Sequence, residues 1–285
     1  THQSLDYKQM SIKELNKLPL HNGIVDFKLS KMSFKMLNVL NDDATVVRYF
    51  WQGSNDLPSL ELWSDISREK GVYIDVGAHT GTYTMSALIS NSSNLVVSIE
   101  PYYLNMARLV TNLRLNGLEK NVRQMILAAS DTNGERKFNV KTNSSYLSKG
   151  GRIDNKGYLV KTIKLDSLNL TNVNEEIKGL KIDTEGEDLK VLQGSVDLIN
   201  KFKPKIIIEV RNENKIDIQN LLENYNYELF SVNDLKNKIN LKNYNINNVI
   251  NIFANPLKNW GGLGDSCDYM TEKKNSYPIF TNKIT

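Results

Sequence analysis

Apolar and polar positions follow two alternating patterns from residue 72 to residue 255. Short apolar runs with many β-branched residues are typical of buried strands and occupy 72–76, 95–100, 122–130, 179–182, 203–210, 227–232 and 249–255. The segments between them carry apolar residues three or four positions apart, which predicts helices over 82–91, 102–118, 188–202 and 216–225. Strands that alternate with helices form a parallel sheet with helices on both faces. We therefore predict an α/β fold with a doubly wound, mostly parallel sheet at its core.

Three segments lie outside this alternation. Residues 1–70 are predicted to form a helical N-terminal extension, because 33–40 (SFKMLNVL) and 56–71 (DLPSLELWSDISREKG) have apolar residues at helical spacing. Within the main domain, residues 71–256, the turn-forming sequences DTNGE and SKGG predict a hairpin-like insertion at about 131–166. Residues 257–285 are expected to form an irregular C-terminal tail.

The sequence VYIDVGAHTGTYT, residues 72–84, places an acid at the end of a strand and a glycine turn directly after it. A P-loop would need a lysine after its second glycine, and none follows Gly81. A dinucleotide fingerprint would need G-x-G-x-x-G, whereas only Gly77 and Gly81 are present. S-adenosylmethionine suits the pattern better. Asp75 can hold its methionyl ammonium, directly or through water, and the helix N-terminus favours its carboxylate.

A second acid, Glu100, ends the next predicted strand. A carboxylate at this place can accept hydrogen bonds from ribose hydroxyls, as it does in dinucleotide-binding folds. A dehydrogenase would share this feature, so the spacing D-x-G-x-x-x-G, rather than Glu100, favours S-adenosylmethionine over a nicotinamide cofactor. A turn without any ligand is disfavoured, because two acids in an empty cleft would be desolvated without compensation.

Six blocks of the sequence occur in the order and spacing of the FkbM-type S-adenosylmethionine-dependent methyltransferases: YIDVGAHTGTYT, SIEP, ASDTNGE, LDSL, KIDTEGEDLKVLQG and KPKIIIEV. The chain resembles this family over residues 70–255, and KIDTEGE is the specific block. The resemblance implies a Rossmann-like class I methyltransferase fold, whose sheet has seven strands with the last one antiparallel. It also implies O-methylation of a hydroxyl on a sugar, glycan or natural product such as a polyketide.

The resemblance further implies which residues hold the cofactor. The matching positions are Asp75, Gly77, Ala78, His79 and Gly81 in the cofactor loop, Glu100 and Pro101 in the ribose-binding turn, and Ala129 and Ser130 near the adenine. The family often has Asn where this chain has His79. We expect His79 to orient the cofactor or to pack in its loop, although an imidazole can also act as a base near neutral pH.

Methyl transfer to a hydroxyl is helped by a base that removes the hydroxyl proton. KIDTEGE places Asp183 at a strand end and Glu185 in the following turn, and Glu209 ends the next strand. Because these strand ends lie beside the cofactor cleft, Asp183, Glu185 and Glu209 are candidates for a base, for acceptor orientation or for metal binding. Glu185 could instead cap the next helix, and Glu187 suits that helix's first turn. Glu209 could instead pair with Arg211 or Lys205. Without a tight D-x-D spacing we predict no metal.

Aromatic residues offer one candidate for binding the acceptor. Trp51, in the sequence RYFWQG, could stack on a sugar ring, and Trp63 and Trp260 are weaker candidates. Aromatic residues at helical or strand spacing are more often part of the core.

Composition limits the partners. The chain has 285 residues, of which 40% are hydrophobic and 24% charged, and its net charge of +4 comes from scattered basic residues. We therefore expect a small-molecule or glycan acceptor and no nucleic-acid partner, while homo-oligomerisation stays open. No apolar run reaches the length of a membrane span. The single cysteine, Cys267, excludes an internal disulfide and suits a reducing compartment, so a cytoplasmic location is expected.

Three hypotheses for function follow. The first is an S-adenosylmethionine-dependent O-methyltransferase that modifies a sugar, a glycan or a natural product. The second is a methyltransferase-like module that binds the cofactor or a glycan without turnover. The third, disfavoured by the missing third glycine, is a nicotinamide-dependent oxidoreductase.

Overall fold

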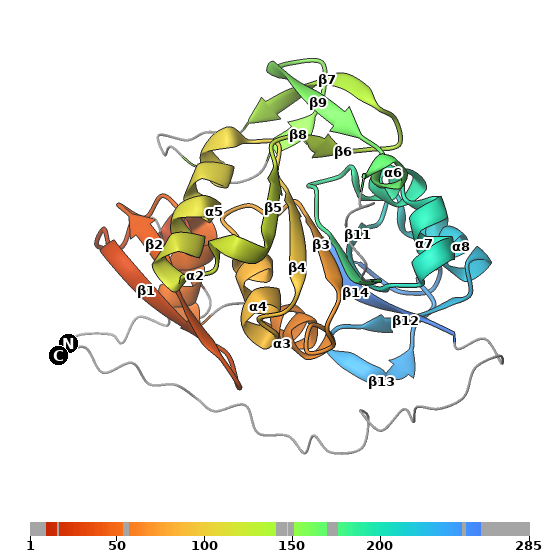
Figure 1. Cartoon of the computed structure of the whole chain (residues 1–285), viewed down its shortest axis with the longest axis horizontal. Helices are drawn as coiled ribbons and strands as arrows, with labels where there is room; N and C mark the ends of the chain where they lie inside the picture. The colour runs from red at the N-terminus through yellow and green to blue at the C-terminus, as the bar shows by residue number, and fades with distance from the viewer. Residues whose placement is uncertain are drawn as a thin grey trace.

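The structure is a computed structural model, which describes residues 10–15, 17–53, 57–140, 147, 151–169, 176–246 and 249–257. Its centre is a sheet in which eight described strands are paired (Figure 1). In spatial order they are β13 (Asp234–Lys238), β12 (Tyr227–Ser231), β14 (Val249–Pro256), β11 (Lys205–Arg211), β10 (Ile177–Ile182), β3 (Val72–Val76), β4 (Leu95–Ile99) and β5 (Val122–Met125).

The sheet is parallel from β11 to β5, and the last strand, β14, runs antiparallel to both β11 and β12. This arrangement confirms the predicted class, a mostly parallel sheet with an antiparallel last strand. The predicted strand count of seven was wrong, because β13 adds an eighth described strand at the edge. Its sequence, DLKNK, is polar and lacks the apolar run that identifies a buried strand, and among the described strands β13 pairs with β12 alone.

Helices cover both faces of the sheet. The residues of α3 (Leu57–Ile66), α4 (Thr82–Ser90) and α5 (Tyr103–Asn116) pack into one hydrophobic cluster. The residues of α6 (Asp188–Gln193), α7 (Val196–Phe202) and α8 (Lys215–Asn224) pack into another. The single helix predicted over 188–202 is divided between α6 and α7 at Gly194, whose Cα lies so close to the Ser130 carbonyl that an added Cβ would be 2.1 Å from it.

The N-terminal extension is a β-hairpin with short helices rather than a purely helical segment. Strands β1 (Asn22–Lys28) and β2 (Ser33–Val39) pair antiparallel, flanked by α1 (Ile12–Leu15) and α2 (Ala44–Gln52). The helix predicted over 33–40 was wrong: Phe34 and Met36 are buried while Ser33 and Lys35 are exposed, which is the period-two pattern of a half-buried strand. The hairpin lies against α5 (Figure 1).

The predicted insertion at 131–166 forms most of a separate small sheet (Figure 1). Its order is β6 (Ala128–Ala129), β9 (Tyr158–Ile163), β7 (Gly134–Val140) and β8 (Gly151–Ile153). The strand predicted over 122–130 is therefore split, since β5 belongs to the central sheet and β6 to the small one. Of the predicted tail only residue 257 is described; Trp260 and Cys267 lie outside the described residues.

Gly77 is required by the close approach of two strand ends. Its φ is +74°, and a Cβ added there would lie 1.8 Å from the carbonyl oxygen of Asp183, which follows β10. The glycine that the sequence associates with a ligand thus lets the ends of β3 and β10 meet.

We expect Gly77→Ala to destabilise the protein by about 3–5 kcal/mol, because left-handed backbone strain adds to the overlap with Asp183. Gly53→Ala is the matched control: its φ is +71°, but nothing lies within 4 Å of an added Cβ. It should cost only about 1–2 kcal/mol. Chemical denaturation measures both changes, and equal losses would contradict the importance of the approach.

Candidate active site

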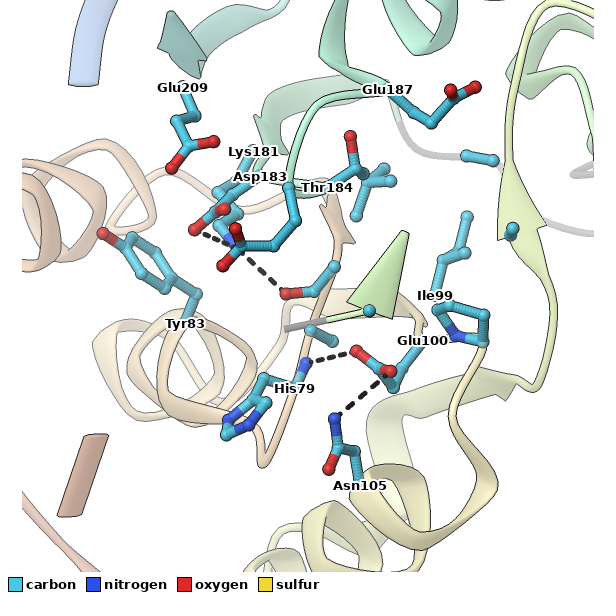
Figure 2. Close-up of a pocket in the computed structure, with 18 of the residues that line it drawn as sticks. His79, Tyr83, Ile99, Glu100, Asn105, Lys181, Asp183, Thr184, Glu187 and Glu209 are labelled. Atoms are coloured by element: carbon cyan, nitrogen blue, oxygen red, sulfur yellow. Dashed lines mark hydrogen bonds and ion pairs between the residues drawn. The ribbon is translucent and has the colours of Figure 1, made fainter. Parts of the chain in front are cut away.

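The carboxyl ends of β3, β4, β10 and β11 open into a cavity of about 540 Å³. Figure 2 shows its lining, with Glu100 and Asn105 on one side and Asp183, Lys181 and Glu209 on the other. The size lies within the range of small-molecule sites, roughly 300–1,000 Å³. It is placed where α/β sheets bind ligands, outside the carboxyl ends of the strands.

The loop between β3 and α4 also contributes to the cavity lining. The backbone N–H groups of Gly77 and Ala78 both donate to the carbonyl of Ile99, at 2.9 and 3.0 Å, which fixes the loop to the end of β4. His79 has a φ of +49°, a left-handed conformation that is uncommon without glycine. Gly77, Ala78 and His79 line the cavity, whereas Gly81 precedes α4 outside the lining and packs against Leu109.

Glu100 is held in the lining by protein donors. Its Oε2 accepts from the His79 N–H at 3.0 Å, and its Oε1 accepts from the Tyr102 N–H at 2.9 Å and from Asn105 Nδ2 at 3.4 Å. Burial raises the pKa of Glu100, and the nearby His79 together with these donors opposes the increase. A carboxylate offers about four acceptor positions. The three donors therefore leave room for one strong external donor, or for two if the long bond from Asn105 gives way.

Asp75, which the sequence places at the ligand, lies behind the loop and does not line the cavity. It is fully buried, and its Oδ2 accepts from Thr84 Oγ1 at 2.7 Å. Its Oδ1 lies 3.6 Å from Lys181 Nζ. Burial raises the pKa of Asp75, while Lys181 and Thr84 act in the opposite direction. Direct contact between Asp75 and a methionyl ammonium does not match this arrangement.

Lys181 is a site residue that the sequence reasoning missed. It lies on β10 and is only 4% exposed, and its Nζ donates to the Gly77 carbonyl at 3.0 Å. The same ammonium is 3.5 Å from Asp183 Oδ2 and 4.9 Å from the centre of the Tyr83 ring. A lysine inside the apolar strand IKGLKI was the available signal, because a buried charge requires partners.

The three predicted catalytic acids are brought to one side of the cavity. Asp183, Glu185 and Glu209 all line it, and Figure 2 shows Asp183 and Glu209 with Lys181. Arg211 joins two of them, donating from Nη2 to Glu209 at 2.8 Å and to Glu185 at 3.1 Å. Burial, followed by the charges of Asp183 and a neighbouring aspartate, raises the pKa of Glu209 to about 8, although Arg211 lowers it.

Asp188, also missed from the sequence, shapes the turn that carries these acids. It is fully buried and accepts from the Thr184 N–H, the Thr184 hydroxyl and the Gly186 N–H at 2.8, 2.9 and 3.2 Å. Glu187 occupies the N-cap position of α6 and binds Lys190 Nζ at 2.9 Å, close to its predicted place at the start of this helix.

The other predicted contacts divide between cavity and core. Pro101 and Ala129 line the cavity, whereas Ser130 is fully buried and donates its hydroxyl to Asp131. Trp51 lies outside the lining, with its ring edge-on to Phe50 at 5.1 Å. Among the described residues, no group of three or more His, Cys, Asp or Glu is placed to hold a metal ion. None of the described helices is long and apolar enough to cross a membrane.

This fold and cavity are those of an α/β protein with a ligand-binding site at the carboxyl edge of its sheet. Residues 75–229, more than half of the chain, match the model of the Methyltransferase FkbM domain. The chain belongs to the FkbM methyltransferase family, as the sequence motifs suggested. None of the curated proteins compared with it matches.

The chain is similar to solved structures of methyltransferases, of which three examples follow. The FkbM methyltransferase of Methylobacillus flagellatus KT is 15% identical, with a TM-score of 0.46, and the match covers 74% of this chain. The chain thus spans only 53% of that protein's length. An rRNA methylase of Streptococcus thermophilus is 12% identical over 72% of this chain and 98% of its own (TM-score 0.43). TYW2 of M. jannaschii, solved with AdoMet, is 15% identical, and the match covers 83% of this chain and 86% of TYW2 (TM-score 0.42).

Membership of the FkbM methyltransferase family indicates S-adenosylmethionine as the cofactor. The residues present fit it: the cavity has a suitable volume, and a buried carboxylate with remaining acceptor capacity, Glu100, lies in its lining. The loop that follows β3 contributes backbone to the same lining. The nicotinamide hypothesis therefore loses its support.

We expect Glu100→Gln to weaken S-adenosylhomocysteine binding by about 1.5–3 kcal/mol, the usual contribution of hydrogen bonds to a charged group. The Gln side chain has about the same volume as that of Glu, so packing against the loop is preserved. Glu119→Gln, in an exposed turn after α5, is the control and should leave affinity unchanged. Calorimetric titration measures both variants, and equal affinity for Glu100→Gln and the unsubstituted chain would exclude Glu100 as a ribose ligand.

Proposed function

We propose that this methyltransferase is an O-methyltransferase whose acceptor is a hydroxyl group of a sugar, a glycan or a natural product. The observation that carries the proposal is the pair of acids, Asp183 and Glu209, in the same cavity as the cofactor loop. A hydroxyl is a weak nucleophile until its proton is being removed, and carboxylates beside it are suited to that task. Asn251, which also lines this cavity, adds an amide that can bind further hydroxyls.

In this proposal the cofactor lies across the loop. Glu100 holds the ribose hydroxyls, the Gly77–His79 backbone lies along the methionyl part, and Pro101 and Ala129 contact the adenine. When bound, S-adenosylmethionine supplies an electrophilic methyl group. The protein's share is to hold the acceptor oxygen in line with that group and to exclude water.

The two acids have different tasks in the proposal because their environments differ. Asp183 accepts the proton of the acceptor hydroxyl, since its side chain is 35% exposed and faces the cavity. Glu209, with its pKa raised to about 8 by burial, carries a proton at neutral pH and donates a hydrogen bond to the acceptor. Arg211 holds the Glu209 carboxyl in place and also binds Glu185 in the neighbouring turn.

The direct test is transfer of a labelled methyl group from S-adenosylmethionine to a panel of neutral sugars, glycans, polyols and amines. We expect a hydroxyl product, and Asp183→Asn should lower turnover by roughly 10²–10⁴ while S-adenosylhomocysteine affinity changes little. Asp197→Asn, on the exposed start of α7, is the control. Methylation of amines alone would contradict O-methylation. Cofactor binding without turnover of any acceptor would favour a non-catalytic module.

The pH dependence separates the roles of the acids. Because Glu209 acts in its protonated form, we expect turnover to fall as pH rises through about 8, where it ionises beside Asp183. Glu209→Gln remains neutral and should lose this alkaline decline. Glu187→Gln, whose parent carboxylate is held by Lys190, should keep it. Turnover that instead rises through about pH 8 would make Glu209 the base.

A further inference from the structure

Lys181 lies between a buried acid and the cavity. In the parallel pairing of β10 with β3, Lys181 is the register partner of Asp75. Its ammonium is 3.6 Å from Asp75 Oδ1 on the core side and 3.5 Å from Asp183 Oδ2 on the cavity side. It also donates to the Gly77 carbonyl at 3.0 Å, in the loop that lines the cavity.

These contacts join three parts of the site through one group. A buried ammonium must be compensated by nearby acceptors, and its position is set by where they lie. The groups that compensate it here include the core carboxylate of Asp75, the Gly77 carbonyl of the cofactor loop and the carboxylate of Asp183. Movement of the Lys181 ammonium would therefore move the loop carbonyl and Asp183 relative to each other. Asp75 does not line the cavity, and Lys181 pairs with both Asp75 and Asp183, so the lysine connects the buried carboxylate to the cavity side.

We infer that Lys181 is a positioning residue, which holds the cofactor loop at Gly77 and the Asp183 carboxylate in a fixed relation. The effect on the loop is independent of the acceptor. The effect on Asp183 rests on the proposed function. Asp75, in this inference, is the anchor of Lys181 rather than a ligand of the cofactor.

A simpler role for Lys181 would be to neutralise Asp75. The two roles differ when both charges are removed together. Replacing a buried ion pair by neutral groups is often close to neutral for stability, whereas removing one partner leaves an uncompensated charge. If Lys181 only neutralises Asp75, the double variant should recover stability and cofactor affinity alike. If Lys181 positions the loop, stability returns but affinity does not.

The experiment compares Lys181→Met, Asp75→Asn and Asp75→Asn/Lys181→Met by thermal unfolding and by calorimetric titration with S-adenosylhomocysteine. Lys181→Met should lower the unfolding midpoint by about 10 °C, and the double variant should return to within about 3 °C of the unsubstituted chain. Affinity should fall about tenfold or more in both Lys181 variants, a change of about 1.4 kcal/mol per factor of ten, and by less than about threefold in Asp75→Asn.

Lys178→Met is the matched control. Lys178 also lies on β10 and also pairs with two carboxylates, those of Glu69 and Glu176, both at 2.8 Å, but at the end of the strand away from the cavity. It should leave the affinity within about twofold, since it contacts no part of the cofactor loop. If the Met double variant does not fold, Asp75→Asn/Lys181→Gln provides a second neutral pair that keeps a polar group in place.

Native affinity in a stable double variant would overturn the inference. An equal loss of affinity in Asp75→Asn would do so as well: the substituted amide oxygen can still accept from Lys181, so the loss would mean that the charge of Asp75 serves the cofactor directly. Failure of both neutral pairs to fold would also contradict it, because Lys181 would then be needed for the fold itself. These readouts require no acceptor, so absence of methyl transfer would refute the proposed function without affecting them. With an active acceptor, the double variant should also lose turnover beyond the loss expected from affinity.

Discussion

The carboxylate of Asp75 is fully buried in the centre of the sheet, and the surrounding site depends on how its charge is compensated. Desolvation of such a group costs several kcal/mol unless it is paired and hydrogen-bonded. Thr84 supplies a hydroxyl from α4, and Lys181 supplies a positive charge from β10. Three neighbouring elements are thereby joined at the point where the cavity begins. The same lysine lies 3.5 Å from Asp183, and both residues line the cavity. The ammonium that compensates the buried Asp75 is therefore also a positive charge beside Asp183 in the cavity lining.

Close packing of the strand ends shapes the cavity further. Gly77 allows the end of β3 to meet the backbone at Asp183, and the turn that follows is held by the buried carboxylate of Asp188. On the other side, Glu100 binds the His79 and Tyr102 N–H groups and so joins the loop to the start of α5. Each of these acids combines a structural contact with a position at or near the cavity. The burial and raised pKa values of Asp188 and Glu100 therefore do not by themselves identify a ligand contact.

Much of the fold could be predicted because its signals are local. Buried parallel strands are continuous apolar runs, and the ends of α5 and β3 are marked by Gly117 and by the glycine turn. The hairpin at 22–39 was missed because a short half-buried strand and a short amphipathic helix share apolar positions. The division at Gly194 depends on a carbonyl from residue 130, which no local pattern reveals.

The sequence predicted at which edge of the sheet the site lies, but not which contacts its side chains make. Acids at the ends of β4, β10 and β11 indicated where the cavity would lie, since topology alone brings those ends together. Which residue lies beside a buried acid depends on the register of adjacent strands. For Asp75 that register places Lys181 beside it, and the sequence alone cannot reveal this pairing.

The central claim is that this cavity holds S-adenosylmethionine in front of a buried Asp75–Lys181 pair. A crystal structure of the chain with S-adenosylhomocysteine tests it most directly. The account predicts ligand density in the cavity, a ribose hydroxyl within hydrogen-bonding distance of Glu100, and Lys181 still between Asp75 and Asp183. Density for the ligand at another place, or a methionyl ammonium bound directly to Asp75 with Lys181 displaced, would contradict it.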